Sequence, residues 1–273
     1  MRKSFKLYSI LSVFLVGLLF ITSNRCKKED ENPPELPPAD AILMDFSDFD
    51  NGVPQGKKSV TSYNNFGYSV LTIGVWNTAA AINILIPVAA YAEALHHEAV
   101  YLGENSWQWQ YSITIAQSTF TVKLISKRIS NAQFTLKMLV SKSGTDGFED
   151  FKWIEGTVRY DRTKANWTIY ESPDVSWPVV EIEWTRDWEK DLYTIKYTCE
   201  KPDSDLHGGT IEHGVTEDPV FDAYYIITFP SNTINIEWNR TTKAGRVKSQ
   251  SYFGNSEWHC WDESLLDVTC GNI

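Results

Sequence analysis

Residues 107–115 read Trp-Gln-Trp-Gln-Tyr-Ser-Ile-Thr-Ile, and this stretch decides the fold. Aromatic and branched residues fill every odd position, while Gln, Ser or Thr fills every even position. A period of two is typical of a β-strand with one dry face and one wet face. The alternation recurs down the chain, so the sequence predicts a large antiparallel sheet.

The later strands show the same alternation and are separated by short turns typical of hairpins. Their apolar phases fall within residues 120–124, 134–140, 151–160, 167–169, 180–184, 193–199, 225–229, 234–238 and 247–260. About eleven strands joined in this way form an up-and-down barrel or a strongly curved sheet. Val158 and Tyr160 are out of phase with Phe151 and Trp153, which predicts a β-bulge near Gly156.

Residues 66–97 lack the period of two and are rich in alanine, which favours a helix. Pro87 predicts a kink, or a division into two shorter helices. Asn77, Asn83 and Glu93 interrupt the apolar run and argue against a membrane-spanning segment. Because a sheet with one dry face needs a cover, we expect this kinked helix to cover or plug the sheet.

The N-terminus has the layout of a cleaved signal peptide over residues 1–25. Arg2, Lys3 and Lys6 precede an almost wholly apolar run from Ile10 to Ile21. That run is too short to span a bilayer comfortably, since a spanning helix needs about 20 apolar residues.

Cys26 ends this leader and resembles the lipidated first residue of bacterial lipoproteins, although Arg25 departs from the small residue that the family prefers. Lys27-Lys-Glu-Asp-Glu31 resembles the export signal of Bacteroidetes-type surface lipoproteins. The resemblance implies lipidation at Cys26 and an outer-membrane location, displayed at the cell surface or facing the periplasm. A solvated linker behind an ordinary secretory signal is the alternative.

Residues 26–40 are charged and rich in proline, which predicts an extended, disordered tether. Residues 41–273 then form a single β-rich domain. Its first strand is predicted at residues 41–46, which read Ala-Ile-Leu-Met-Asp-Phe.

The charge balance argues against nucleic acid as a partner. The whole chain has 25 Lys+Arg and 35 Asp+Glu, and removing Arg2, Lys3, Lys6 and Arg25 leaves 21 − 35 = −14. Nucleic-acid affinity depends on basic patches, which such a chain lacks. The acidic balance is typical of a soluble domain that resists self-association.

Tryptophans supply the candidate ligand contacts. Trp107, Trp109, Trp153 and Trp184 fall in the apolar phase of their strands. A helix followed by a long, aromatic-rich antiparallel meander resembles lipoprotein carriers of the LolA/LolB type. This resemblance of order and pattern implies that the protein binds or carries an apolar or amphipathic ligand such as a lipid.

A surface glycan-binding module is the alternative from another class. Trp177 and Trp188 lie in predicted loops, where they could stack on sugar rings or fold back over the core.

Other reactive residues indicate structure rather than catalysis. Cys260 and Cys270 are the expected disulfide pair, and Cys199 is expected to be a buried hydrophobe. His207 and His213 are candidate metal ligands, but their spacing matches no metal motif, and an acidic loop explains them. No motif predicts a catalytic residue or a cofactor, so a hydrolase with an unrecognised carboxylate site is a third hypothesis.

Overall fold

The computed structural model describes residues 32–49, 63–115 and 118–273. Pro33–Ile273 forms one compact unit, distinct from Met1–Asn32. The signal peptide predicted over residues 1–25, the lipidation site Cys26 and the export signal at residues 27–31 lie outside the described residues.

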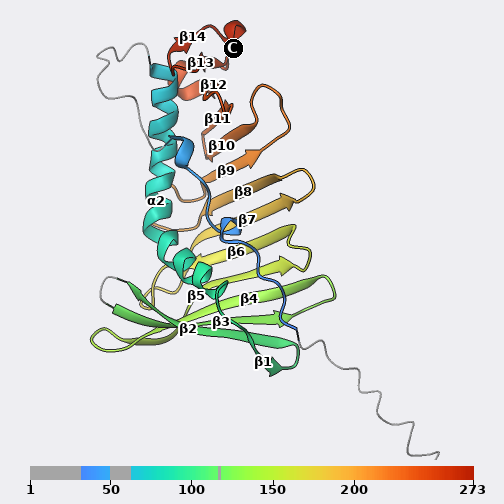
Figure 1. The fold of residues 1–273 in the computed structure, drawn as a ribbon. Helices are drawn as coiled ribbons and strands as arrows, with labels where there is room; N and C mark the ends of the chain where they lie inside the picture. The colour runs from blue at the N-terminus through green and yellow to red at the C-terminus, as the bar shows by residue number, and fades with distance from the viewer. Residues whose placement is uncertain (1–31, 50–62, 116–117) are drawn as a thin grey trace, which may run out of the picture. The chain divides into compact units, whose positions relative to one another are not determined.

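Fourteen strands form one antiparallel meander, in which each strand pairs with its neighbours in the sequence (Figure 1). The strands are β1 Val100–Gly103, β2 Ser106–Ile115, β3 Ser118–Arg128, β4 Gln133–Lys142, β5 Phe148–Arg159, β6 Lys164–Tyr170, β7 Pro178–Asp187, β8 Leu192–Cys199, β9 Thr210–Val215, β10 Ala223–Phe229, β11 Asn232–Trp238, β12 Gly245–Ser249, β13 His259–Trp261 and β14 Asp267–Val268. The structure therefore confirms the mainly β fold and its meander order.

The sheet is open, since β1 and β14 stand at its two edges and do not pair among the described residues. Figure 1 shows that it curves strongly, so that β2 and β3 turn away from the direction of β8–β12. Of the two predicted forms, the curved sheet is therefore the one observed. β13 and β14 contain only three and two residues, so the last strands offer little edge for closing a barrel.

The apolar segment forms one continuous helix, α2, over Asn64–Ala94. It continues through Pro87 and bends towards its C-terminal end in Figure 1. Its N-terminal end packs on β12–β14 and its C-terminal end on β2 and β3, so the helix spans the dry face of the sheet. Residues spaced three or four apart form its buried face, among them Ile73, Trp76, Ala80 and Ile84.

Residues 33–49, which we call the N-terminal strap, also lie on the dry face. The strap contains two short 3-10 helices, η1 Ala39–Ala41 and η2 Ser47–Phe49, and no strand. The predicted strand at residues 41–46 is therefore wrong. The disordered tether is also wrong for residues 33–40, because Pro34, Leu36 and Pro37 are buried.

Aromatic side chains of the sheet and of α2 hold the strap by hydrogen bonds to its carbonyl oxygens. Tyr91 Oη donates to Pro37 O (2.7 Å), Trp167 Nε1 to Ala41 O (2.9 Å), and Tyr197 Oη to Ile42 O (2.8 Å). Tyr225 Oη donates to Asp45 O in the same way. These bonds satisfy backbone groups that a sheet ladder would otherwise satisfy, which explains how an apolar run is buried without forming a strand.

The register of β5 corrects one further prediction. Met138 pairs with Ile154 and Leu139 with Lys152, so the inserted residue is Trp153 and the bulge is not at Gly156. Gly156 instead pairs with Trp167, and a Cβ there would stand 2.4 Å from the indole ring. The glycine therefore provides space for the ring of its cross-strand partner.

Candidate functional site

The strand tryptophans predicted to bind a ligand are mainly core residues. Trp107, Trp109 and Trp184 are buried, and Trp153 is half-buried at the bulge of β5. Because α2 and the strap cover the dry face, these side chains mainly pack the protein interior. A different tryptophan, Trp76 of α2, lies beside the space that remains.

A cavity of about 40 Å³ lies between the middle of α2 and the strands β7 and β8. Its lining is mainly apolar and comprises Trp76, Ala79, Ala80, Asn83, Ile84, Val179, Val180, Tyr197, Cys199, Lys201, Ser204 and Leu206. A pocket for a small molecule commonly measures about 300–1,000 Å³, so this cavity is too small to hold one without a movement of its walls.

Trp76, one of the lining residues, carries an unpaired polar atom. Its side chain is only 3% exposed, and its Nε1 has no hydrogen-bond partner in the part of the chain that the structure describes. A buried donor without a partner costs about 1–3 kcal/mol. An acceptor atom of a bound ligand would remove that cost. Sequence reasoning missed Trp76 because it considered the tryptophans of strands and loops only; its small neighbours Ala79 and Ala80 were the available signal.

A chain of polar contacts starts at Lys201, beside the cavity. Lys201 Nζ forms an ion pair with Glu171, whose other carboxylate oxygen accepts a hydrogen bond from Trp177 Nε1 (2.7 Å). The hydrogen bonds from Lys201 and Trp177 lower the pKa of Glu171. Charges of both signs therefore lie next to an apolar cavity, an arrangement that suits an amphipathic ligand.

The two loop tryptophans do not form one platform. Trp177 precedes β7 and Trp188 follows it, and ten residues of strand at roughly 3.3 Å each separate them by about 30 Å. Trp188 lies between the guanidinium groups of Arg162 and Arg186, which are 5.5 and 5.0 Å from its ring centroid. Both indoles are about half-exposed, at 44% and 45%, so each could contact a sugar ring only by itself.

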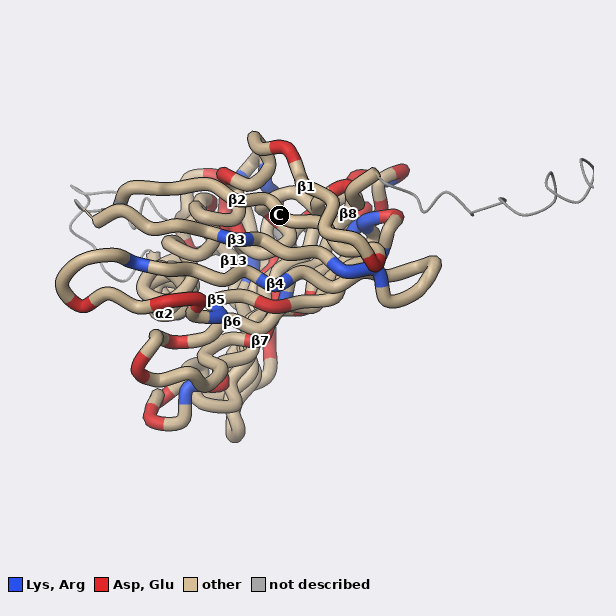
Figure 2. The backbone as a smooth tube through the Cα atoms, turned by 90° about the horizontal axis from the view of Figure 1, so that it is seen from below, with Lys and Arg blue, Asp and Glu red and all other residues tan. Residues whose placement is uncertain are grey.

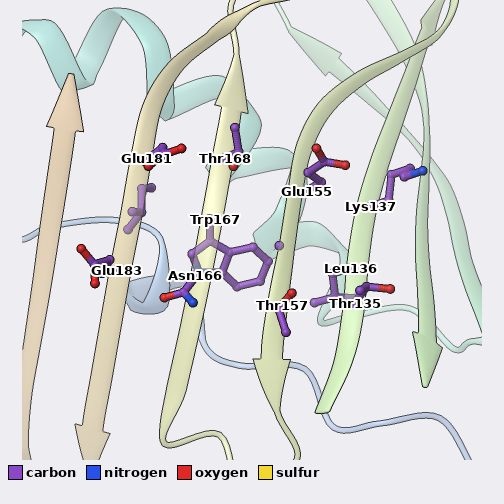
Figure 3. A pocket seen from close by; sticks show the side chains of 12 residues that line it. Thr135, Leu136, Lys137, Glu155, Thr157, Asn166, Trp167, Thr168, Glu181 and Glu183 are labelled. Carbon is purple, nitrogen blue, oxygen red and sulfur yellow. The ribbon is translucent and has the colours of Figure 1, made fainter. Parts of the chain in front are cut away.

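The wet face of the sheet has a shallow hollow of about 610 Å³ over β4–β7 (Figure 3). Lys137, Glu155, Asn166, Glu181 and Glu183 are among its polar lining residues. Figure 2 shows acidic and basic residues interspersed over the strands and loops. The lining of the hollow over β4–β7 lacks the predominantly apolar character that is typical of a ligand pocket.

The hollow gives little support to the hydrolase hypothesis. Glu155 accepts hydrogen bonds from Lys152 Nζ (2.7 Å) and from Tyr170 Oη. Burial raises the pKa of Glu155, but these two bonds outweigh it and lower the pKa. The carboxylate is thus held ionised, which does not suit a general acid.

His213 and His207 lie in different environments. His213, on β9, is buried, and both of its ring nitrogens are engaged, Nδ1 with Tyr224 O and Nε2 with Tyr193 Oη, each at 3.0 Å. His207 is exposed in the loop before β9. Among the described residues, no group of three or more His, Cys, Asp or Glu side chains could hold a metal ion.

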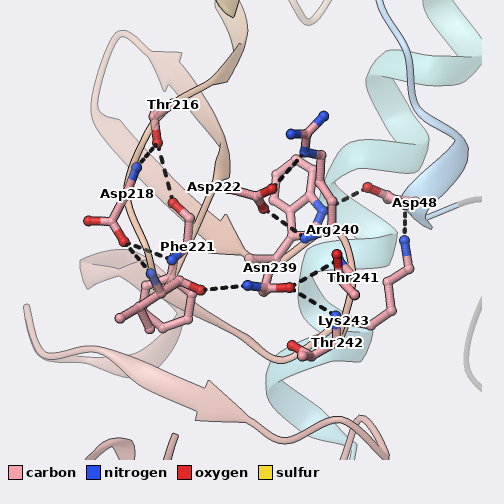
Figure 4. A network of polar contacts seen from close by, with 12 residues as sticks. Asp48, Thr216, Asp218, Phe221, Asp222, Asn239, Arg240, Thr241, Thr242 and Lys243 are labelled. Atoms are coloured by element: carbon pink, nitrogen blue, oxygen red, sulfur yellow. Dashed lines mark hydrogen bonds and ion pairs between the residues drawn. The ribbon is translucent and has the colours of Figure 1, made fainter. Parts of the chain in front are cut away.

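The loops around β10–β12 carry a polar network with a structural role (Figure 4). Asp48 of the strap accepts a hydrogen bond from Trp238 Nε1 (2.8 Å) and pairs with Lys243. Asp222 pairs with Arg240 (3.0 Å). The partners satisfy one another, so the network fixes the strap to the sheet.

No family model matches the chain, and no curated protein or solved structure matches it either. The geometry of the chain itself therefore has to support any functional conclusion.

Proposed function

We propose that the protein is a lipid-anchored outer-membrane lipoprotein that binds an apolar or amphipathic ligand between α2 and the sheet. Cys26 carries the lipid, residues 27–32 link it to the domain, and the binding region is the cavity under α2. The role is binding or carrying rather than catalysis.

The observation that carries this proposal is the unpaired Nε1 of Trp76, a residue that lines a mainly apolar cavity. Buried polar groups are normally hydrogen-bonded, and an exception needs an explanation. A ligand with an acyl chain and one acceptor group would fill the cavity and pair this donor. Lys201 and Ser204 also line the cavity, so they are available to the polar group of such a ligand.

Binding requires α2 to move away from β7 and β8, because about 40 Å³ cannot hold an acyl chain. Pro87 removes one bond of the internal ladder of α2, so we take this position as the hinge about which the helix would move. Such opening corresponds to the movement of a lid.

Displacement of a fluorescent fatty acid by palmitate tests the proposal. Trp76→Phe keeps an aromatic ring but removes the donor, so the affinity for palmitate should fall about tenfold, the effect of about 1.4 kcal/mol. Ala80→Phe should abolish binding by filling the cavity.

Trp184→Phe is the matched control, since it removes another buried Nε1 without a partner, at a position outside the cavity lining. Its affinity for palmitate should equal that of the wild type. Equal affinities of the Trp76→Phe and Trp184→Phe variants, or no binding at all, would refute the cavity as the ligand site.

A further inference from the structure

The outward face of α2 is an apolar surface on the side opposite the sheet contacts. Its exposed large residues are Leu71, Val75, Ile82, Leu85 and Ile86, which we call the outer stripe. Leu71 is 74% exposed and Ile82 76% exposed. Spacings of three, four and seven residues place these side chains along one side of the helix.

The outer stripe contains no charged residue, and Glu93 near the C-terminal end is the one charged residue of α2. A helix on the surface of a soluble protein normally has a polar outer face, and a large apolar patch marks a contact with something else. By length and composition alone α2 could cross a membrane, and 28% of its most apolar 18-residue window is buried. Its contacts with β2 and β12–β14 hold it against the sheet instead.

The chain enters the domain at the C-terminal end of α2. Pro33, Pro34 and Leu36 line a surface hollow together with Ala94 and Leu95, at the C-terminal end of α2. Leu95 is itself exposed, and so are Val100 and Leu102 of the following strand. Residues 26–32 reach at most about 25 Å when fully extended, so a lipid at Cys26 would keep this end of α2 close to the membrane.

We propose that the outer stripe docks in the acyl-chain boundary of the bilayer that holds the lipid of Cys26. The inference rests on the proposed lipid anchor and adds a second membrane contact. The stripe makes this contact through apolar area alone, since it contains no basic residue.

A lipid surface fits the stripe better than a second copy of the chain does. A soluble helix pair normally has charged residues flanking its apolar seam, which set partner and register. Residues 64–92 contain none.

Photocrosslinking tests this inference with phosphatidylcholine vesicles whose acyl chains carry a diazirine. The naturally acylated protein is compared with the chain that begins at Cys26, coupled through Cys26 to a maleimide lipid, because Cys199 is buried and Cys260 and Cys270 are bonded. In both forms, crosslinks should map to residues 71–95. A variant that combines Leu71→Gln, Ile82→Gln and Leu85→Gln should reduce the yield of these crosslinks about tenfold.

Ile129→Gln and Val220→Gln, at exposed apolar positions away from α2, should leave the yield unchanged. Crosslinks that avoid α2 would overturn the inference, and so would a dimer in ultracentrifugation that the stripe substitutions dissociate. Failure of acylation in cells alone would contradict the proposed anchor, while the chemically coupled form would still test the stripe. Binding in the cavity is measured separately by palmitate displacement. A failure of the anchor or of the outer stripe therefore does not decide the ligand site.

Discussion

At the scale of single residues, His213 shows how burial fixes a charge state in this sheet. A carbonyl oxygen can only accept, so Nδ1 donates to Tyr224 O, and Nε2 accepts from Tyr193 Oη. The imidazole stacks on Trp238 and packs against Tyr225, with ring centroids 5.6 and 4.7 Å apart. Burial lowers the pKa of His213 below 6.5 and raises the pKa of Tyr193 to about 12.

We expect His213 to make the stability of the fold depend on pH. As the pH falls below 6.5, the unfolded chain binds a proton that the folded chain resists, so stability decreases until the pH reaches the folded pKa. The loss cannot exceed about 1.4 kcal/mol per pH unit. Urea unfolding from about pH 7.5 to about pH 5.5 measures it.

His213→Phe should reduce the slope of the free energy of unfolding against pH, whatever its effect on absolute stability. His207→Gln, which changes an exposed histidine, should retain the slope. Identical slopes in all three proteins would show that His213 is not responsible.

At the scale of elements, the start of α2 is capped from the far end of the chain. Asp267 of β14 accepts hydrogen bonds from the backbone N–H groups of Asn64 (3.1 Å) and Asn65 (2.9 Å). Asn65 Nδ2 in turn donates to Cys260 O (2.9 Å). The disulfide between Cys260 and Cys270, the pair expected from the sequence, encloses Asp267 in a short loop. The C-terminal segment thus satisfies donors that a helix leaves unpaired.

Asp267→Ala should lower the free energy of unfolding by about 1–2 kcal/mol, because it removes a cap and a negative charge at the helix N-terminus. Denaturant unfolding measures the change. Asp174→Ala, which changes an exposed carboxylate in the loop before β7, serves as the control and should change stability by less than about 0.5 kcal/mol. An Asp267→Ala variant as stable as that control would contradict the cap.

At the scale of the whole molecule, the location of the domain depends on the proposed lipid anchor at Cys26. Cys26→Ala should abolish incorporation of labelled fatty acid and reduce the membrane-bound fraction, because a stripe on α2 alone gives only reversible attachment. Cys199→Ala is the matched control, since this buried free cysteine should not affect labelling. Unchanged labelling of the Cys26→Ala variant would exclude lipidation at this residue.

The period-two pattern from residue 107 onwards determined the antiparallel meander, because alternation along a strand is a local property of the backbone. Alanine content determined the helix over most of residues 66–97 for the same reason. Local patterns failed where distant partners decide the outcome. Residues 33–49 read as a tether and a strand, yet Trp167, Tyr197 and Tyr225 from three separate strands hold them on the dry face.

Tertiary structure also decided the site. The sequence places Trp107 and Trp184 on an apolar face, but only the position of α2 and the strap shows that these rings are buried in the core. It equally shows that Trp177 and Trp188 lie at opposite ends of β7. The cavity beside Trp76 and the outer stripe depend on which side of one all-apolar helix meets the sheet. An apolar pattern without a polar face does not specify that side, so only packing fixes it.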